Sequence, residues 1–366
     1  MKRTYTYQVL EGDARTVGRL AAKNLRETTP EAVTFYAKPF MENAERLKEG
    51  NRLLELNERW CPGLNEEIAG FAEELGVEPE AVVYYTATIP KTGHCSHFAI
   101  MPDRTTTGTT LCGRSYEWSL DDALTLSTVR IPGRAAHTGF GVFAFGRFDG
   151  VNERGLWVSM SAANPTAALP ETEGFRFWSL LRTILDRASS VEEALEIARP
   201  FPLSFHLNLI VADKGGHAAL IEKAPTVMDV KKIDRGFLYS TNHYALPATK
   251  ASTEKRFEHS LKRSSFLEET LGSGQQSPES IKRMLSSPFP RGLACHYYEE
   301  WFGTLWSIEA DLSTGTIEVC FGPADAGENR YRTFSPRDPA GLAQFEAELP
   351  LEKAPEGTWA VEQNRT

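Results

Sequence analysis

The chain has 366 residues, a hydrophobic content of 41% and a formal net charge of -9. This length is enough for one large domain or two ordinary domains with a proper core. Acidic and basic residues are mixed along the chain and form no basic stripe, which argues against a nucleic-acid partner. The start, MKRTYTYQVLEGDAR, has no apolar run of a secretory signal, and no window approaches the roughly 18 apolar residues of a membrane helix. We therefore expect a cytoplasmic protein with no membrane partner.

The cysteine pattern argues against a disulfide framework and against a zinc ribbon. The number of cysteines is odd and no CxxC motif occurs, so at least one thiol should be free. Three of them lie in apolar strand or helix contexts and are expected to belong to the core: Cys112, Cys295 and Cys320.

The first part of the chain is predicted to be helical. Apolar residues recur at helical spacing over residues 13–27, 40–59 and 60–76, and Gly76 is placed as a helix C-cap. Residues 76–89 fit either a helix or a strand, with Pro79 near the start.

The pattern changes near Pro90, where short β-type runs begin. Two helices are expected at 175–188 and 191–201, the second opened by a capping box from Ser190 to Glu193. The aromatic residues of 175–178 are expected to pack that first helix against the core. Strands are expected at 96–101, 109–116, 127–132, 137–148, 156–162, 206–213, 217–223, 226–233 and 236–242.

The last third is predicted to hold two helices and a hairpin. A basic amphipathic helix covers 253–271, and Ser277 is the N-cap of the next helix with Pro278 in its first turn. A β-hairpin turns at 313–315, and the chain after Pro336 is expected to be polar and weakly structured. Because the strands cluster rather than alternate with helices, the order favours an α+β fold with antiparallel sheets, covered by helices on both sides.

Cys95 stands out because it lies where the helical part meets the first strand, between His94 and His97. If 96–101 and 109–116 pair as a hairpin, Arg114 and Glu117 return close to this thiol. A guanidinium there would favour the thiolate, and a carboxylate there could hold an α-amino group of a freed cysteine.

These residues carry a resemblance to a known family. Cys-Ser-x-Phe-Ala, a threonine and glycine turn, and Gly-Arg-x-x-Glu-Trp resemble the acyl-coenzyme A:6-aminopenicillanic acid acyltransferase family. They are more distantly similar to the choloylglycine hydrolase and penicillin V acylase group of N-terminal-nucleophile (Ntn) hydrolases. Four later segments agree in order, so the resemblance runs from about residue 94 to 323: GVNERGLWVSMSAANP, HLNLIVADKGGHAALIEKAP, LYSTNHY and TLWSIEADLSTGTIEVCFG.

The resemblance implies a four-layer αββα sandwich and a cut between His94 and Cys95. It divides the chain into a helical leader at 1–94, a catalytic domain at 95–336 and a polar tail at 337–366. The freed Cys95 would be nucleophile and N-terminal amine at once, so no cofactor or metal is required. The implied catalytic residues are Cys95, Arg114, Glu117, Asn164, Asn242 and Arg256, with Arg263 as a rival for the later arginine.

In these roles Arg114 tunes the thiolate, while Asn164 and Asn242 stabilise the oxyanion or orient the amine. The sequence departs from the family at two positions: His94 replaces a frequent glycine, and Glu117 stands where aspartate is usual. The predicted function is a cysteine Ntn amide hydrolase or acyltransferase that acts on a small-molecule acyl amide or acyl thioester. A homo-oligomer is compatible with the sequence.

Three alternatives stay open at this point. His94, Cys95 and His97 could be metal ligands, although no second ligand cluster is evident nearby. The chain could be an uncleaved cysteine hydrolase with His94 or His97 as its base. It could also be a non-catalytic binding protein that retains the Ntn fold. The Gly139 and Gly141 pair lacks the following GxxG helix of a dinucleotide site.

Overall fold

Two stacked β-sheets form the centre of the molecule. The computed structural model describes residues 1–36, 43–88, 94–119, 124–142, 145–163, 174–175, 177–252, 255–324 and 330–363. The larger sheet has nine strands in the order β10-β9-β8-β7-β6-β5-β4-β1-β17, and only the β1–β4 pair in it is parallel. Its strands are β1 (Lys2–Glu11), β4 (Leu124–Arg130), β5 (His137–Val142), β6 (Asp149–Asn152), β7 (Leu156–Ala162), β8 (Leu207–Asp213), β9 (Ala218–Lys223), β10 (Met228–Ile233) and β17 (Leu342–Glu348).

The smaller sheet has seven strands, all paired antiparallel, in the order β11-β2-β3-β14-β15-β16 with β13 beside β14. A separate two-stranded ribbon pairs β12 with β18. These strands are β2 (His94–Ile100), β3 (Leu111–Trp118), β11 (Phe237–Ser240), β12 (Lys255–Phe257), β13 (His296–Tyr297), β14 (Phe302–Asp311), β15 (Thr316–Phe321), β16 (Arg332–Phe334) and β18 (Val361–Gln363).

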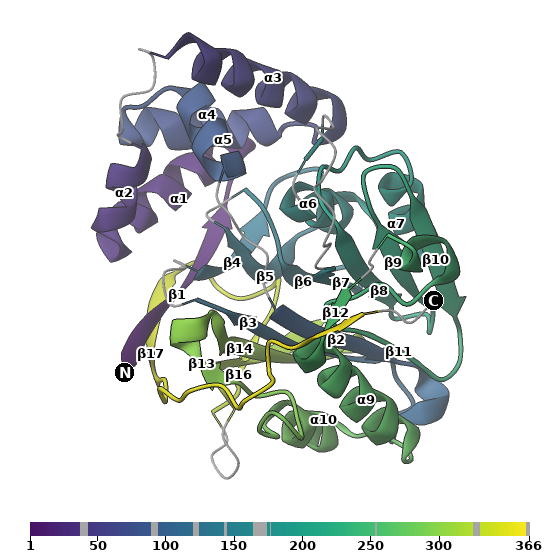
Figure 1. The fold of residues 1–366 in the computed structure, drawn as a ribbon. Helices are drawn as coiled ribbons and strands as arrows, with labels where there is room; N and C mark the ends of the chain where they lie inside the picture. Colours follow the sequence, from purple (N-terminus) through teal and green to yellow (C-terminus); the bar gives the residue numbers. More distant parts are fainter. Residues whose placement is uncertain are drawn as a thin grey trace.

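Helices cover the outer face of each sheet, which gives the four layers predicted from the sequence (Figure 1). Helices α6 (Phe177–Arg187) and α7 (Val191–Ala198) pack on the nine-stranded sheet, and α9 (Glu258–Gly272) and α10 (Pro278–Leu285) pack on the seven-stranded sheet. The strands between these layers are buried on both faces, and β8 reads LNLIVAD for that reason. The α+β sandwich with antiparallel sheets is therefore confirmed.

A group of helices from the N-terminal part stands beside this sandwich (Figure 1). It consists of α1 (Ala14–Thr28), α2 (Pro30–Tyr36), α3 (Ala44–Trp60), α4 (Leu64–Leu75) and α5 (Pro79–Thr88), while the short α8 (Pro247–Lys250) follows β11. The segment that fitted either a helix or a strand is thus the helix α5. Gly76 ends α4 in the left-handed conformation, at φ 71°, as its C-cap position predicted.

Two of the expected helix starts can be compared in detail. Ser277 caps α10 and forms a capping box with Ser280, and Pro278 lies in the first turn as predicted. Ser190 caps α7 by accepting the N–H of Glu193, but the Glu193 carboxylate accepts from Ser189 rather than from the N–H of Ser190. The capping box predicted there is therefore only half formed.

Both ends of the chain contribute strands that the sequence did not reveal. Residues 2–11 form β1, an inner strand that pairs with β4 on one side and with β17 on the other. The expectation of a weakly structured tail is therefore wrong for Leu342–Glu348, because this segment pairs with β1 from Lys2 to Gln8. Leu349 lies against the sheet and is fully buried. The segment boundaries at residues 94 and 336 stay a prediction.

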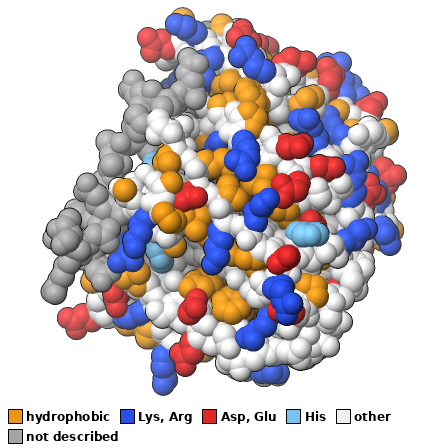
Figure 2. Space-filling model, turned by 90° about the vertical axis from the view of Figure 1, so that its right-hand side faces the viewer, with side chains coloured by type: hydrophobic (Ala, Val, Ile, Leu, Met, Phe, Trp, Pro, Cys, Tyr) orange, Lys and Arg blue, Asp and Glu red, His pale blue; other side chains and the backbone are white. Residues whose placement is uncertain are grey.

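The surface carries charges of both signs. Figure 2 shows one face of the molecule, where Lys and Arg side chains are interspersed with Asp and Glu side chains. Among the described helices, none is long and apolar enough to cross a membrane.

Candidate active site

Cys95 is the second residue of β2, and the predicted hairpin with β3 is present. In the register of this pair, Cys95 lies opposite Tyr116, and His97 lies opposite Arg114. The pleat sends alternate side chains to opposite faces. Cys95 and His97 face the nine-stranded sheet, whereas His94 and Ser96 face α9.

Arg114 is the cation nearest to the Cys95 thiol. Its Nη2 donates to Cys95 Sγ over 3.4 Å, and its Nε lies 2.8 Å from a carboxylate oxygen of Asp149 on β6. Its Nη1 donates to the Met160 carbonyl on β7. All three side chains that meet here are completely buried: Cys95, Arg114 and Asp149. The guanidinium therefore ties the two sheets together directly beside the sulfur.

His97 lies on the same face as Cys95 but is engaged elsewhere. Its Nδ1 lies 2.9 Å from the Ser159 hydroxyl, and its Nε2 lies 3.2 Å from the Ser161 hydroxyl. Burial and the nearby Arg114 charge keep the pKa of His97 well below its ordinary value. His97 is therefore a neutral bridge between β2 and β7.

His94 lies among aromatic rings on the other face of β2. Its ring centroid is 4.9 Å from that of His259, and 5.5 Å from those of Phe302 and Trp359. Burial, together with the Arg263 charge, lowers its pKa to about 3. Within the described residues, neither histidine hydrogen-bonds to the Cys95 sulfur, so the histidine-base alternative has no contact to support it.

A second arginine, Arg263 of α9, organises this face. Its Nη1 donates to the Ser96 hydroxyl over 2.9 Å, and its Nη2 donates to the Asn242 side-chain oxygen over 2.7 Å. The same Nη1 lies 3.7 Å from the Glu117 carboxylate, and the guanidinium stacks over the Phe302 ring at 5.2 Å. Arg263 thus joins β2, β3 and the loop after β11 at one point.

Glu117 is a buried carboxyl group at the end of β3, opposite His94 in the register. It accepts hydrogen bonds from the hydroxyls of Ser115 and Thr304. Burial raises its pKa to about 7, although the Arg263 charge opposes the rise. This group can therefore change its charge near neutral pH, opposite the residue that precedes Cys95.

Asn242 connects the two sheets on the same side. Its amide nitrogen donates to the Ala162 carbonyl at the end of β7 over 2.9 Å, and its oxygen accepts from Arg263. Its backbone N–H donates to the Ser260 hydroxyl over 2.8 Å. The amide is consequently fixed in one orientation.

The surroundings of the Cys95 thiol favour its protonated form. Burial raises its pKa to about 12, and Glu117 adds to the rise, while Arg114, Arg263 and the backbone N–H of Glu117 act in the opposite direction. Within the described part of the chain, no group of three or more His, Cys, Asp or Glu side chains is placed to hold a metal ion.

Comparisons with known proteins bear on this arrangement. The model of the acyl-coenzyme A:6-aminopenicillanic acid acyl-transferase family matches residues 106–326, more than half of the chain. The chain belongs to this family. The matched range includes Arg114, Glu117, Asn242 and Arg263, and it begins after Cys95.

Several solved structures are similar to this chain. A variant of conjugated bile acid hydrolase from Clostridium perfringens is 13% identical, with a TM-score of 0.44 over 71% of this chain and 99% of that chain. Penicillin V acylase from Agrobacterium tumefaciens is 12% identical, with a TM-score of 0.42 over 71% of this chain and 100% of that chain. The search of curated proteins gives no match.

As a member of the acyltransferase family, the chain is an enzyme of the Ntn hydrolase and acyltransferase type that acts on amide bonds. The family resemblance predicted from the sequence is thus confirmed, whereas the individual catalytic roles stay predictions. Asn164 lies outside the described residues. Arg256 is half-buried on β12, where its charge helps to lower the pKa of His243 to about 4. Arg263, the rival, is the arginine that contacts Asn242 and lies beside Glu117.

Sequence reasoning missed the partners of the two arginines. Asp149 lies in GRFDGVNERG, beside a segment that carried the resemblance, but no sequence pattern marks it as the counter-ion of Arg114. Ser96 and Thr304 lie 208 positions apart in the chain. Ser96 accepts a hydrogen bond from Arg263, Thr304 donates one to Glu117, and Arg263 lies beside Glu117. Only the fold brings such side chains together.

Proposed function

We propose that Cys95 is the nucleophile of a cysteine Ntn amide hydrolase or acyltransferase, and that cleavage of the His94–Cys95 bond activates it. The observation that carries the proposal is the pair of buried arginines around this one residue. Arg114 contacts the thiol, and Arg263 with Glu117 lies on the opposite face of the hairpin, beside Ser96 and opposite His94 in the register. A buried charge pair on each side of an inert cysteine has little structural purpose, since such pairs stabilise a fold weakly.

The uncut chain would be a latent form. With its pKa near 12, the thiol is almost entirely protonated at neutral pH, and the sulfur is buried. In the cut, the sulfur adds to the His94 carbonyl carbon and the Cys95 nitrogen leaves with the thiol proton, which yields a thioester. Water then adds to the thioester, so that His94 gains a carboxylate and the thiol is regenerated beside a free amine.

The freed amine would then serve as the base. An α-amino group has a pKa of about 8, so part of it is neutral at pH 7 and accepts the thiol proton. The sulfur attacks the substrate carbonyl, and the leaving amine departs with a proton from the ammonium group. This step leaves an acyl-cysteine, which water or an acceptor amine then cleaves.

The surrounding residues have separate roles in this proposal. Arg114 stabilises the thiolate, and Glu117 holds the ammonium form of the new N-terminus. Asn242 donates to the oxyanion and is oriented by Arg263, and Asn164 is the second proposed donor. Losing one such donor typically costs about a hundredfold in rate. The family arginine is proposed to be Arg263 rather than Arg256, because Arg263 contacts Asn242.

The substrate is proposed to be a small acyl amide or acyl thioester, in keeping with the acyl transfer in the family's name. Hydrolysis and transfer differ only in whether water or an amine reaches the acyl-cysteine. We also propose that the protein is located in the cytoplasm.

The cut should not release the leader, which we define as residues 1–94. Its strand β1 lies between β4 and β17 and hydrogen-bonds along both edges. Its Glu67 is completely buried and pairs with Arg134 at 2.6 Å and with Arg182 of α6 at 2.9 Å. Removing the leader would expose an inner sheet edge and leave buried charges unpaired, which costs free energy.

Mass spectrometry of the purified protein tests the proposal. Under denaturing conditions we expect two pieces, 1–94 and 95–366, and under native conditions their summed mass. Cys95→Ala should remain whole, and Cys95→Ser, which keeps a weaker nucleophile, should be cut more slowly. A wild-type chain that stays whole, or a Cys95→Ala chain that is cut at the same bond, would falsify the proposed activation.

A further inference from the structure

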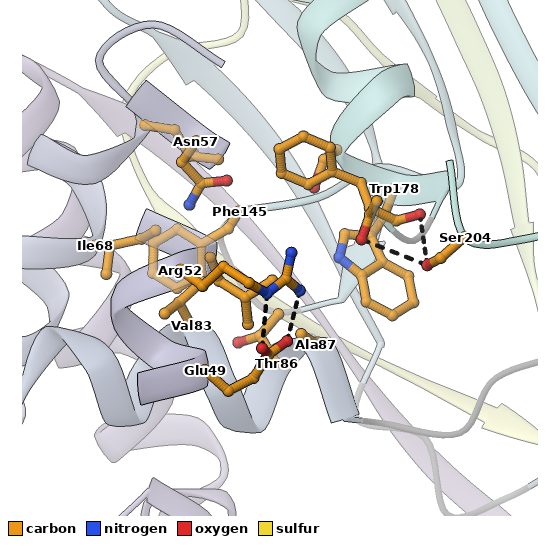
Figure 3. A pocket seen from close by; sticks show the side chains of 15 residues that line it. Glu49, Arg52, Asn57, Ile68, Val83, Thr86, Ala87, Phe145, Trp178 and Ser204 are labelled. Atoms are coloured by element: carbon orange, nitrogen blue, oxygen red, sulfur yellow. Dashed lines mark hydrogen bonds and ion pairs between the residues drawn. The ribbon is translucent and has the colours of Figure 1, made fainter. Parts of the chain in front are cut away.

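A cavity of about 260 Å³ lies between the leader and the catalytic part (Figure 3). On one side it is lined by α3, α4 and α5, and on the other by Phe145, the loop at Gly174 and Phe175, and α6. Among the described residues, Cys95, Arg114, Glu117, Asn242 and Arg263 are not part of its lining.

The walls of the cavity are mainly apolar. Leu53, Ile68 and Val83 come from the leader helices, and Figure 3 shows Trp178 across the space from Ile68 and Val83. The aromatic residues at 175 and 178 were expected to be packing residues, and both Phe175 and Trp178 are indeed buried. Trp178 has a second role, because it also forms the far wall of this cavity.

The charges of the cavity's described lining balance each other. Among the lining residues that the structure describes, Glu49 and Arg52 are the only charged ones, and they form two hydrogen bonds to each other, of 2.7 and 2.6 Å. Their side chains are 41% and 30% exposed, so they mark the mouth of the cavity. A charged guest would lose its hydration and gain no unpaired counter-ion, which disfavours anions and cations alike.

Asn57 supplies a polar group in the lining of the cavity. Its residue is only 3% exposed, and Figure 3 shows its amide turned into the cavity. Within the described residues its side chain makes no hydrogen bond, whereas the Thr86 and Ser204 hydroxyls donate to backbone carbonyls at 2.8 and 3.1 Å. The Asn57 amide is therefore free to pair with a guest that both donates and accepts.

We propose that this cavity binds a small uncharged molecule with an apolar body and one amide-type group. The apolar body would lie between Trp178 and the leader helices, and the amide group would pair with Asn57. A cavity of about 150 Å³ accepts benzene, so this volume suits a ring with a short polar substituent. Because the guest touches both parts, it also strengthens the attachment of the leader to the catalytic part.

The test uses three ligands of similar shape and different charge: benzamide, benzoate and benzylamine. Calorimetric titrations into full-length Cys95→Ala protein measure binding whether or not the proposed chemistry of Cys95 is correct. We expect benzamide to bind at least about tenfold more tightly than either charged ligand, since neither finds a counter-ion. Benzamide should also raise the melting temperature. Equal binding of all three, or no binding of benzamide, would overturn the proposal.

Variants place the binding in this cavity. Asn57→Leu should weaken benzamide binding about tenfold, because the amide of the ligand then has no partner. Asn51→Leu is the matched control on the same helix, where the exposed Asn51 amide donates to the Leu47 carbonyl, and it should leave binding unchanged. Val83→Phe should abolish binding by filling the space, and Ala87→Leu is a smaller change with the same purpose. Undiminished binding in a folded filling variant would show that the ligand sits elsewhere.

Discussion

The two faces of the β2–β3 hairpin carry different kinds of charge pair around the same cysteine. On the face toward the nine-stranded sheet, Arg114 and Asp149 are 2.8 Å apart, and the arginine also contacts the sulfur. On the face toward α9, Arg263 and Glu117 are 3.7 Å apart, and the pKa of Glu117 is raised to about 7. The first pair places a guanidinium beside the thiol, whereas the second contains a carboxyl group that titrates near neutrality opposite His94.

This difference corresponds to the two functions that an N-terminal nucleophile combines. A thiolate benefits from a permanent cation, which an arginine held by a buried carboxylate provides. The amine must exchange a proton, and a neighbouring carboxyl group that titrates near neutrality can gain or lose its own proton over the same pH range. If Cys95 is the proposed N-terminal nucleophile, the pleat of β2 places the pair that contacts its thiol and the pair that titrates on opposite faces of the strand.

The largest effect is expected from breaking the pair on the thiol side. Arg114→Met leaves Asp149 buried without its partner, so the free energy of unfolding should fall by about 3–5 kcal/mol. The additional change Asp149→Asn removes the orphaned charge and should restore most of the stability. Urea unfolding of both variants and of the wild type measures this.

Thiol reactivity separates the electrostatic role of Arg114 from its structural role. The double variant should remain about tenfold or more slower than the wild type toward iodoacetamide after maturation, because the cation is gone. A double variant that is both stable and fully reactive would show that Arg114 serves the fold alone.

A smaller effect distinguishes the two candidate arginines on the α9 side. Arg263→Met removes the donors to Ser96 and Asn242 and should cost about 2–3 kcal/mol, together with slower cleavage before Cys95. Arg256→Met changes a half-buried residue on the β12–β18 ribbon, and should cost less than about 1 kcal/mol. Urea unfolding and the time course of the cut by intact mass compare them. If Arg256→Met slows the cut more than Arg263→Met does, the assignment of the family arginine reverses.

The sequence was most informative where local pattern and chemistry coincide. Alternating strands and the turn between them predicted the pairing of β2 with β3, and with it the approach of Arg114 to Cys95. Helix-end signals such as Gly76 and Ser277 were also correct, because capping depends on a few neighbouring residues.

The features that the sequence does not reveal depend on contacts between residues that lie far apart in the chain. No local pattern shows that β1 lies inside the large sheet. Its partner β17 belongs to a polar segment whose sequence predicts weak structure. Arg256 and Arg263 have similar positions in the sequence pattern, and only the packing of α9 on β2 turns Arg263 toward Asn242. Asp149 is likewise recognised only when β6 lies opposite the hairpin.

The smallest effect concerns the titration of Glu117. Its folded-state pKa of about 7 lies above the ordinary value of 4.5, so the folded protein binds more protons than the unfolded chain between these values. Stability should therefore fall as the pH rises from 4.5 to about 7 and then level off, by about 1–3 kcal/mol from this group. Glu117→Gln cannot titrate, so its stability relative to the wild type should increase across that window. Urea unfolding at several pH values measures the difference, and Glu348→Gln, an exposed change on β17, should leave the wild-type pH dependence unaltered. Parallel pH profiles for Glu117→Gln and the wild type would mean that Glu117 is ionised throughout, and the contrast between a fixed and a titrating pair would then be lost.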